Sequence, residues 1–457
     1  MQSWSAELTS SLSTPCCKGH VKIAADAWEC QTCHANFPIH DGIPWFYAKP
    51  AVTYSDWQNR FGYLLAVLNS EAESIKVELT QENLRKSTEK RLRQYLQSKV
   101  EQIKELQKIL SPLQLKAPGP VDYHIALKNK LPENQTLMSY YPNVFRDWSW
   151  ETDENKLCLE ALATVITEPE KLGTMAVLGA GACRLPADVH IQFKPEATIA
   201  VDINPFLFYV AKRVLDGRNV TAYEFPIAPL DAASFSVKQK CQYDGPKLPN
   251  FFFLFADAMN PSFKDGSLDT ILTPWLIDVV PQDFPSFARQ VNRPLKTGGK
   301  WINFGSVSFN SSKQGQCYSR DEIAEIVAQS GFRVTTIKAV DIPYMQSPHS
   351  AQKRFENVFC FEAEKVSEVG TVADFNYLPD WLTDETKGVP KLEKFAQLIS
   401  VNQTFNVVVG LIDGNRSVTQ IAEQVHERFG LSLAQTKELV KRLLTNIFEG
   451  SLRGRQF

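Results

Sequence analysis

A short glycine-containing turn near the middle of the chain constrains the fold most strongly. Residues 177–184 read Val-Leu-Gly-Ala-Gly-Ala-Cys-Arg and continue a short apolar run. Gly179 and Gly181 let the backbone turn tightly and approach a ligand closely at the carboxyl edge of a parallel sheet. Asp202 ends the next apolar run, 21 positions beyond Gly181. A carboxylate there can accept hydrogen bonds from both ribose hydroxyls, so the pattern predicts a nucleoside-binding site.

The apolar runs around this turn predict an open, mostly parallel α/β sheet. They are short and alternate with helix-like stretches, and glycines mark the turns between them, which favours strand–helix–strand units. The expected strands cover residues 175–178, 197–201, 250–255, 268–273 and 300–304. Asp257 and Ala258 follow the third of these strands, where an adenine amino group would lie. Asp278 comes just after the fourth, at the same edge.

The 457 residues are enough for about three domains. Leucine, valine and isoleucine recur between Leu92 and Leu106 at spacings of three and four, which predicts an amphipathic helix. Residues 392–450 carry two further helical patterns, separated by the polar turn at residues 413–416. The expected parts are a small cysteine-bearing head (1–50), a helical cap (51–160), the α/β core (161–366), a linker (367–391) and a small helical domain (392–457).

Composition excludes several classes of protein. Lysine and arginine total 49 against 51 aspartates and glutamates, so the formal net charge of -2 gives no case for a nucleic-acid partner. No apolar stretch approaches the roughly 18–20 residues that span a bilayer, so no membrane partner is expected. The N-terminus lacks a secretory pattern, and four of nine cysteines crowd into residues 16–33 rather than forming a disulfide framework. A cytoplasmic protein is therefore expected.

Several motifs together are similar to class I S-adenosylmethionine-dependent methyltransferases. The glycine turn, the strand-end acids Asp202 and Asp257, and Leu-Lys-Thr-Gly-Gly-Lys at 295–300 occur in the order of that family. Arg184 stands where a dinucleotide fingerprint has its third glycine, so a pyrophosphate ligand is not supported. The resemblance implies an α/β, Rossmann-like class I methyltransferase core with S-adenosylmethionine as cofactor.

Within that class, residues 70–365 resemble the carnosine N-methyltransferase family. The resemblance is specific at Arg-Asp-Trp-Ser (146–149) and at Gly-Gly-Lys-Trp-Ile-Asn-Phe-Gly (298–305), and looser at residues 277–278 and 318–323. It implies cofactor contacts from the Arg-Asp-Trp segment before the core, from the glycine turn and from the strand ends. These residues are Asn143, Arg146, Gly179, Gly181, Arg184, Asp202, Asp257 and Ala258.

The resemblance also implies an imidazole as methyl acceptor. Asp278 corresponds to the family's aspartate that contacts the substrate imidazole, and a carboxylate suits a ring N–H that becomes more acidic during methylation. Asn310 stands where the family has a substrate-contacting histidine, so carnosine itself is less expected than a related histidine derivative. Tyr344 and His349 are further candidates for the pocket. Cys183 lacks a basic neighbour in sequence and is expected to be a small packing residue.

The favoured function is N-methylation of the imidazole ring of a small histidine-derived molecule, such as a carnosine-like compound or a histidine-derived thiol. Three alternatives remain open. They are methylation of a peptide or protein, S-methylation of a small thiol, and a non-enzymatic interaction protein with a vestigial methyltransferase fold.

The two ends of the chain resemble small accessory modules. Cys30 and Cys33 have the two-residue spacing of zinc ligands, and their segment resembles zinc ribbons found in activators of tRNA and protein methyltransferases. Cys17 matches a third ligand, and the fourth is Cys16 or His20, because Thr14 stands where the first cysteine usually lies. A structural zinc ion, or a degenerate metal-free ribbon, is expected. Residues 405–450 are similar to PqqD-like domains, which bind peptides; a plain packing or dimerisation domain is the alternative.

Overall fold

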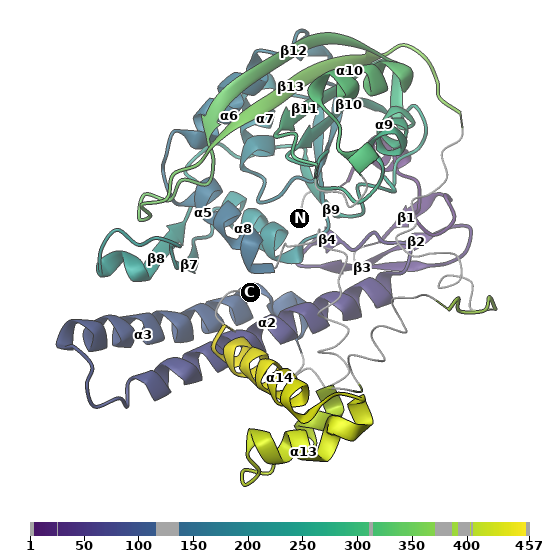
Figure 1. The fold of residues 1–457 in the computed structure, drawn as a ribbon. Helices are drawn as coiled ribbons and strands as arrows, with labels where there is room; N and C mark the ends of the chain where they lie inside the picture. The colour runs from purple at the N-terminus through teal and green to yellow at the C-terminus, as the bar shows by residue number, and fades with distance from the viewer. Residues whose placement is uncertain are drawn as a thin grey trace. The chain divides into compact units, whose positions relative to one another are not determined.

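The computed structural model describes residues 4–24, 26–115, 137–309, 314–370, 386–391, 403 and 405–453. The chain divides into two compact units, Met1–Phe375 and Asn376–Phe457, and Figure 1 shows its elements. Asn310, one of the expected substrate residues, lies outside the described residues. No helix in the described part of the chain is long and apolar enough to cross a membrane.

The first unit is built on a seven-stranded sheet with the order β12-β13-β11-β10-β5-β6-β9. Five neighbouring strands, from β11 to β9, run parallel, and β13 is antiparallel to both of its neighbours. This strand order is that of the Rossmann-like class I methyltransferase fold, so the expected fold class is confirmed. The strands are β5 (Thr174–Leu178), β6 (Ala197–Asp202), β9 (Phe251–Phe255), β10 (Leu268–Pro274), β11 (Leu295–Gly305), β12 (Phe332–Pro343) and β13 (Phe355–Lys365).

Chain direction across this sheet reverses at β5. From β5 the chain proceeds outward to β6 and β9, and then returns to β10 on the other side of β5. The carboxyl ends of β5 and β10 therefore flank a topological switch point, where open α/β sheets bind their ligands. The helices of this part are α5 (Tyr141–Trp148), α6 (Glu154–Ala163), α7 (Arg184–Phe193), α8 (Pro205–Leu215), α9 (Phe284–Asn292) and α10 (Arg320–Gln329).

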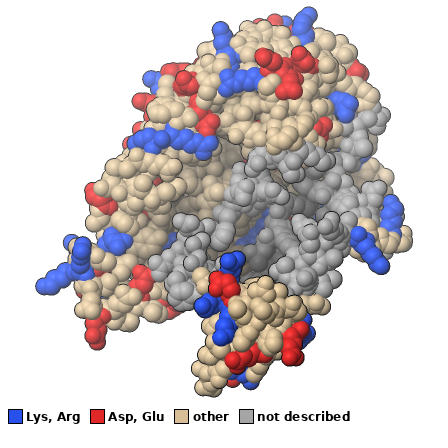
Figure 2. All heavy atoms as spheres, viewed as in Figure 1, with Lys and Arg blue, Asp and Glu red and all other residues tan. Residues whose placement is uncertain are grey.

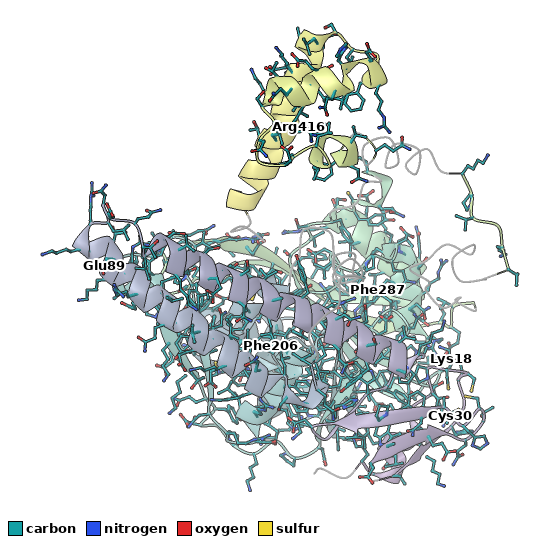
Figure 3. All side chains as sticks on the ribbon, turned by 90° about the horizontal axis from the view of Figure 1, so that it is seen from below. Lys18, Cys30, Glu89, Phe206, Phe287 and Arg416 are labelled. Carbon is teal, nitrogen blue, oxygen red and sulfur yellow. The ribbon has the colours of Figure 1, made fainter. Side chains whose placement is uncertain are left out.

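Two long helices precede the core. They are α2 (Pro50–Glu78) and α3 (Lys86–Ile109), which lie side by side as an antiparallel pair, with Glu89 near its free end (Figure 3). The expected helix over Leu92–Leu106 is part of α3, where Leu92, Ile103 and Leu106 are buried. A short helix, α1 (Ala6–Ser10), and a small antiparallel sheet come before them; its strands are β1 (Val21–Ile23), β2 (Ala27–Cys30), β3 (Asn36–His40) and β4 (Ile43–Pro44).

Shorter elements complete the two units. β7 (Val220–Glu224) and β8 (Val237–Cys241) form a hairpin of their own. In the second unit, α13 (Val418–Phe429) and α14 (Leu433–Arg453) pack around Ile421, Val425 and Val440. The 3-10 helices are η1 (Ser111–Leu113), η2 (Leu137–Tyr140), η3 (Pro169–Lys171), η4 (Ala233–Phe235) and η5 (Gln314–Gln316). On the face drawn in Figure 2, basic and acidic side chains are interspersed over the described residues.

Buried Lys365 ties the end of β13 to the segment that joins α9 to β11. Its Nζ donates to the backbone carbonyls of Asn292 and Leu295, at 3.0 and 2.8 Å. We expect Lys365→Met to lower the free energy of unfolding by about 2–4 kcal/mol, because two buried acceptors lose their donor. The same change at half-exposed Lys296, which pairs with Asp269, should cost less than about 0.5 kcal/mol in denaturant unfolding. Equal losses for the two variants would contradict this reading.

Candidate functional site

The glycine turn forms the floor of the candidate site. Gly179 and Gly181 both have positive φ, at 72° and 58°. The N–H of Gly179 donates to Val201 O at 2.9 Å, and that of Gly181 donates to Asp202 Oδ2 at 2.8 Å. A Cβ added to Gly181 would have no atom within 4 Å, so the space over this residue is open to a ligand. The turn therefore joins the carboxyl ends of β5 and β6 and leaves room above itself.

The two strand-end acids lie next to each other across β6 and β9. Asp202 Oδ1 accepts the N–H of Asn204 at 2.8 Å, and burial raises the pKa of this carboxyl to about 6, although its backbone hydrogen bonds lower it. Ala256, directly before Asp257, donates its N–H to Asp202 O at 3.3 Å. Asp257 Oδ1 accepts the N–H of Met259 at 2.9 Å. Both acids, and half-buried Ala258 after them, lie at the carboxyl edge of the sheet.

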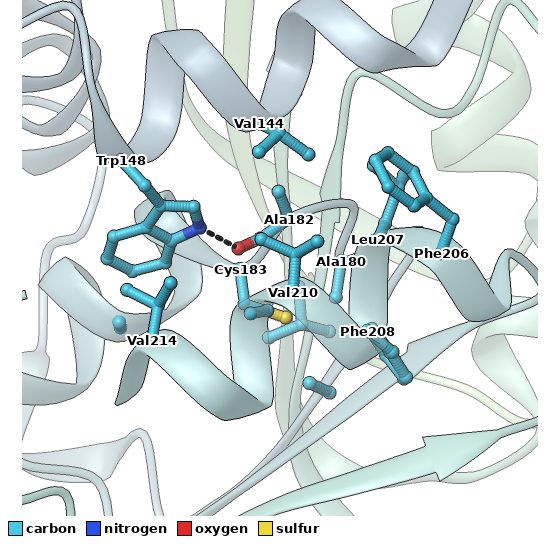
Figure 4. Packing of buried hydrophobic residues seen from close by; sticks show 14 of the residues in the cluster. Val144, Trp148, Ala180, Ala182, Cys183, Phe206, Leu207, Phe208, Val210 and Val214 are labelled. Carbon is cyan, nitrogen blue, oxygen red and sulfur yellow. Dashed lines mark hydrogen bonds between the residues drawn. The ribbon is translucent and has the colours of Figure 1, made fainter. Parts of the chain in front are cut away.

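Helix α5 is anchored on the glycine turn by its last residues. Trp148 Nε1 donates to Ala182 O at 2.8 Å, within a buried cluster that includes Cys183 (Figure 4). Burial raises the pKa of the Cys183 thiol well above its usual value, which agrees with a packing role. Asp147 Oδ2 accepts the N–H of Arg184 at 3.4 Å. The Arg-Asp-Trp motif therefore contacts the turn through its aspartate and tryptophan.

The arginines of this region are held by carboxylates. Arg184 Nε donates to both oxygens of Asp188, at 3.0 and 2.8 Å, and Nη1 donates to Asp147 O at 3.2 Å. Arg146 Nε donates to Asp147 Oδ1 at 2.7 Å and lies 3.9 Å from Glu154 Oε1. Burial disfavours its charged form, but these two carboxylates hold the pKa of Arg146 above its ordinary value. Arg184 thus connects α5 with α7.

Glu154 extends this network toward the late part of the core. Its side chain is 1% exposed and accepts the N–H of Met345 at 3.1 Å. Burial raises the pKa of Glu154, and Arg146 lowers it. Burial raises the pKa of Tyr344, directly before Met345, and the charge of Arg146 lowers it. Sequence reasoning missed Glu154 because an acid in the first turn of a helix is expected to interact with the helix dipole alone.

Tyr140, directly before α5, interacts electrostatically with both Asp202 and Tyr344. Asn143 was expected to contact the cofactor. In the structure its Nδ2 donates to the carbonyl of Tyr140 at 3.3 Å. Burial raises the pKa of Tyr140 above its usual value, and the charges of Asp202 and Tyr344 raise it further. The phenol of Tyr140 is therefore within electrostatic reach of both residues. It carries no sequence motif, so nothing in the sequence indicated it.

Asp278 lies on the other side of the switch point. Its Oδ2 accepts from Ser306 Oγ at 3.2 Å and from the N–H of Ser308 at 2.9 Å, so both donors reach the same oxygen. Burial raises the pKa of Asp278, these hydrogen bonds lower it, and the charge of Glu356 raises it again. The residues after β11 thus orient this carboxylate.

Trp275, three residues before Asp278, forms an aromatic pair with Tyr344. Trp275 follows β10 directly and has a φ of 53°, which is unusual for a bulky residue and marks a constrained turn. Its ring centroid is 4.7 Å from that of Tyr344. A Cβ at Gly305 would be 2.9 Å from Trp275 Cα, so only glycine fits where β11 ends. His349, in contrast, is held on the loop over 228–231, since its carbonyl accepts the N–H of Leu230 at 3.2 Å.

The residues present fit an adenosine-containing cationic cofactor. The open space over Gly181 can receive a ligand, and Asp202 keeps acceptor capacity beyond its two backbone donors, because each carboxylate oxygen has two lone pairs. Asp257 adds a second acid at the same edge. Asp202 ends β6 and Asp257 follows β9, both on one side of β5, and Asp278 follows β10 on its other side.

The four cysteines of the head form a candidate metal site. In the described part of the chain, the sulfur atoms of Cys16, Cys17, Cys30 and Cys33 lie within 4.8 Å of one another, and His20 is not in this group. Three of the separations are 3.8, 3.4 and 3.3 Å. Thiolates around tetrahedral zinc at about 2.3 Å would lie about 3.8 Å apart, so the donor set fits that ion.

The surroundings of the cluster shift the pKa values of two of its thiols in opposite directions, and burial raises that of Cys16 to about 12. Thr14, where a ribbon usually has its first cysteine, has its Oγ1 3.3 Å from Cys30 Sγ. Burial opposes ionisation of Cys30, but hydrogen bonds from Thr14 and from the backbone N–H groups of Cys33 and Thr32 lower its pKa to about 5. A Cβ on Gly19 would be 3.1 Å from Cys30 Sγ and 2.4 Å from Thr32 Oγ1. The loop therefore approaches the sulfur atoms closely.

Comparison with known proteins finds similarity at the level of solved structures. No family model matches the chain, and no curated protein matches it. A Bacillus halodurans protein named as a methyltransferase is 11% identical, with a TM-score of 0.33 over 46% of this chain and 99% of that one. An Aquifex aeolicus SAM-dependent methyltransferase is 13% identical, with a TM-score of 0.30 over 49% and 94%. A Thermotoga maritima SAM-dependent methyltransferase is 16% identical, with a TM-score of 0.30 over 50% and 96%. The strand order, rather than these similarities, carries the fold assignment.

We expect the purified protein to contain close to one zinc ion per chain, measured by elemental analysis. Cys33→Ser should reduce the zinc content to well below half, because the exposed Cys33 supplies one of four ligands. Cys317→Ser is the matched control, since this half-buried cysteine lies outside the cluster, and it should keep the metal. A wild-type protein that binds no zinc after reconstitution would contradict the assignment.

Proposed function

We propose that this chain is an S-adenosylmethionine-dependent methyltransferase. The observation that carries the proposal is the paired arrangement at the ends of β5 and β6. There, the N–H of Gly181 orients the Asp202 carboxylate beneath an open space. A carboxylate at this position can accept the ribose hydroxyls, and Asp257 lies where the adenine amino group would be. Arg146, fixed by Asp147 and Glu154, would form the wall toward the methionine end.

The bound cofactor would supply an electrophilic methyl group on a sulfonium. The protein then has to hold an acceptor atom in line with that methyl group and keep water away. Three aromatic residues support such a pocket, namely Tyr140, Trp275 and Tyr344. Tyr140 lies within electrostatic reach of both Asp202 and Tyr344, and Tyr344 packs against Trp275. Their rings offer apolar walls close to the acids that would bind the cofactor.

For the acceptor, we propose the imidazole ring of a small histidine-derived molecule. Asp278 Oδ2 is fixed by two donors, so the carboxylate has a set direction. An imidazole with a pKa near 6.5 is mostly neutral at pH 7, and its N–H needs an acceptor while the other nitrogen attacks. A carboxylate on that N–H also stabilises the cationic ring that forms. Tyr344 would flank the ring.

The resemblance to carnosine N-methyltransferases supports this assignment at the cofactor residues and at Asp278. Carnosine itself is a weaker candidate, since Asn310 replaces the family's histidine. A histidine-derived thiol or a peptidyl histidine has the same ring chemistry. The zinc-ribbon-like head and the PqqD-like second unit remain part of the proposal, the first on the geometry of its four cysteines.

The first test is calorimetric titration with S-adenosylhomocysteine, for which we expect micromolar binding. Because burial raises the pKa of Asp202 to about 6, the ionised carboxylate predominates only above that pH. Affinity should therefore be constant at higher pH, fall as the pH drops through 6, and be about tenfold weaker one unit below. Asp202→Asn should bind weakly at every pH and lose this dependence. A folded wild-type protein that does not bind would favour a non-enzymatic interaction protein.

The second test is Asp278→Asn, assayed with a panel of histidine derivatives that includes carnosine and a histidine-derived thiol. We expect a fall in kcat of about 10²–10³-fold with unchanged affinity for S-adenosylhomocysteine, because an amide cannot stabilise the imidazolium equally well. Asp265→Asn, at a mostly exposed carboxylate that pairs with Arg293, should keep the wild-type rate. Transfer at near wild-type rate by Asp278→Asn would remove this residue from the mechanism.

A further inference from the structure

The cysteine-bearing head is joined to the cofactor edge of the central sheet. Trp45, directly after β4, forms a parallel bridge with Phe255, and the N–H of Phe46 donates to Phe255 O at 2.8 Å. Phe255 ends the edge strand β9 and is the register partner of Asp202. Figure 1 shows β4 beside β9. The head therefore continues the pairing of the sheet at the level of the strand-end acids.

Tyr47, the next residue along the chain, bonds to the backbone directly after Asp202. Tyr47 is 7% exposed, and its hydroxyl donates to the carbonyl of Ile203 at 3.3 Å. Burial raises its pKa well above the usual value, and the charges of Asp202 and Asp257 raise it further. The phenol thus lies within electrostatic reach of both carboxylates and holds the backbone directly after Asp202.

Aromatic packing connects this tyrosine to the cysteine cluster. Trp28 lies two residues before Cys30 on β2, so both side chains are on the same, buried face of the strand. The Trp28 ring is 5.5 Å from that of Phe46, which neighbours Tyr47 in the chain. Phe37 on β3 packs against Phe46 from 4.8 Å. Cys30, Trp28 and Phe46 are all buried, so the aromatic packing leads from one ligand of the cluster to the residue before Tyr47 (Figure 3 labels Cys30).

These contacts act on a part of the sheet that would otherwise open easily. Loops at the end of an edge strand have few neighbours and are at the low-stability end of a protein. Asp202 ends β6 and Asp257 lies in the loop after β9, and the segment 45–47 bonds to the residues next to them, Phe255 and Ile203. Without the head, the carbonyl of Phe255 at the end of β9 would lose its donor, Phe46 N–H, and the carbonyl of Ile203 would lose the Tyr47 hydroxyl.

We propose that Tyr47 is a positioning residue of the cofactor site, and that the metal-loaded cysteine cluster, through Trp28 and Phe46, holds it there, so that zinc in the head controls cofactor affinity. The inference rests on the proposed methyltransferase function. It assigns to the head a role in cofactor binding that is separate from any recognition of the acceptor.

Tyr47→Phe in the zinc-loaded full-length protein tests the positioning role. We expect S-adenosylhomocysteine to bind about 5-fold more weakly, which corresponds to the loss of one buried hydrogen bond. The KM for the methyl donor should rise by a similar factor, while the KM for the acceptor stays the same. Tyr54→Phe is the matched control, because its hydroxyl also donates to a backbone carbonyl, that of Pro112, at 3.4 Å. It should change thermal stability as much as Tyr47→Phe does, but leave cofactor affinity unchanged.

Zinc removal by a chelator tests the coupling. We expect at least a tenfold loss of affinity for S-adenosylhomocysteine on removal and its recovery when zinc is added back, with circular dichroism confirming an intact core. If zinc removal unfolds the core, the affinity of Tyr47→Phe for S-adenosylhomocysteine decides whether the inference holds. The inference is overturned if the wild-type protein binds S-adenosylhomocysteine and both the zinc-free protein and Tyr47→Phe bind it equally well. The proposed function would stand in that case. Failure of the wild-type protein to bind would instead overturn the proposed function.

Discussion

The hydrogen bond between the Gly181 N–H and the Asp202 carboxylate is the interaction on which the candidate site depends. It exists because β5 and β6 run parallel as neighbours, so the turn after one strand meets the residue that ends the other. With a second donor from Asn204, it gives one carboxylate a set direction in a buried place. A buried carboxylate is tolerated only with such partners, and they bring its pKa to about 6 rather than higher. The acid is thereby ionised at neutral pH and oriented.

Near this bond, ion pairs between buried side chains hold separate segments of the chain together. Arg146 lies between Asp147 and Glu154, and those acids also accept backbone N–H groups of Arg184 and Met345. Both buried acids thus have an opposite charge and a backbone partner, which lowers the cost of burying them. Segments from three distant parts of the chain, namely α5, the glycine turn and the residues after β12, are held together by this single network.

The parts of the fold with strong local signals could be predicted. Five strands of the central sheet were expected from short apolar runs, and each is present with a boundary shift of a few residues at most, except that β11 begins at Leu295. The hairpins β7–β8 and β12–β13 were missed, although β12 and β13 both contain many apolar residues. Helix α2 was expected only as part of the helical cap, without bounds of its own, although its buried Trp57, Phe61, Leu65, Leu68, Ala72 and Ile75 recur at spacings of three and four. Tertiary packing decided these elements.

The sequence by itself determined the chemistry available in this protein: two glycines at a strand end, acids after the neighbouring strands, an Arg-Asp-Trp motif and four cysteines close in the chain. Those features are local, and residue type with spacing is enough to indicate them. Only the tertiary structure decided which groups meet, because strand order and the path of the chain set distances between residues far apart in sequence. It brought Glu154 to Arg146, the backbone of Met345 to Glu154, and the hydroxyl of Tyr47 to the carbonyl of Ile203, directly after Asp202.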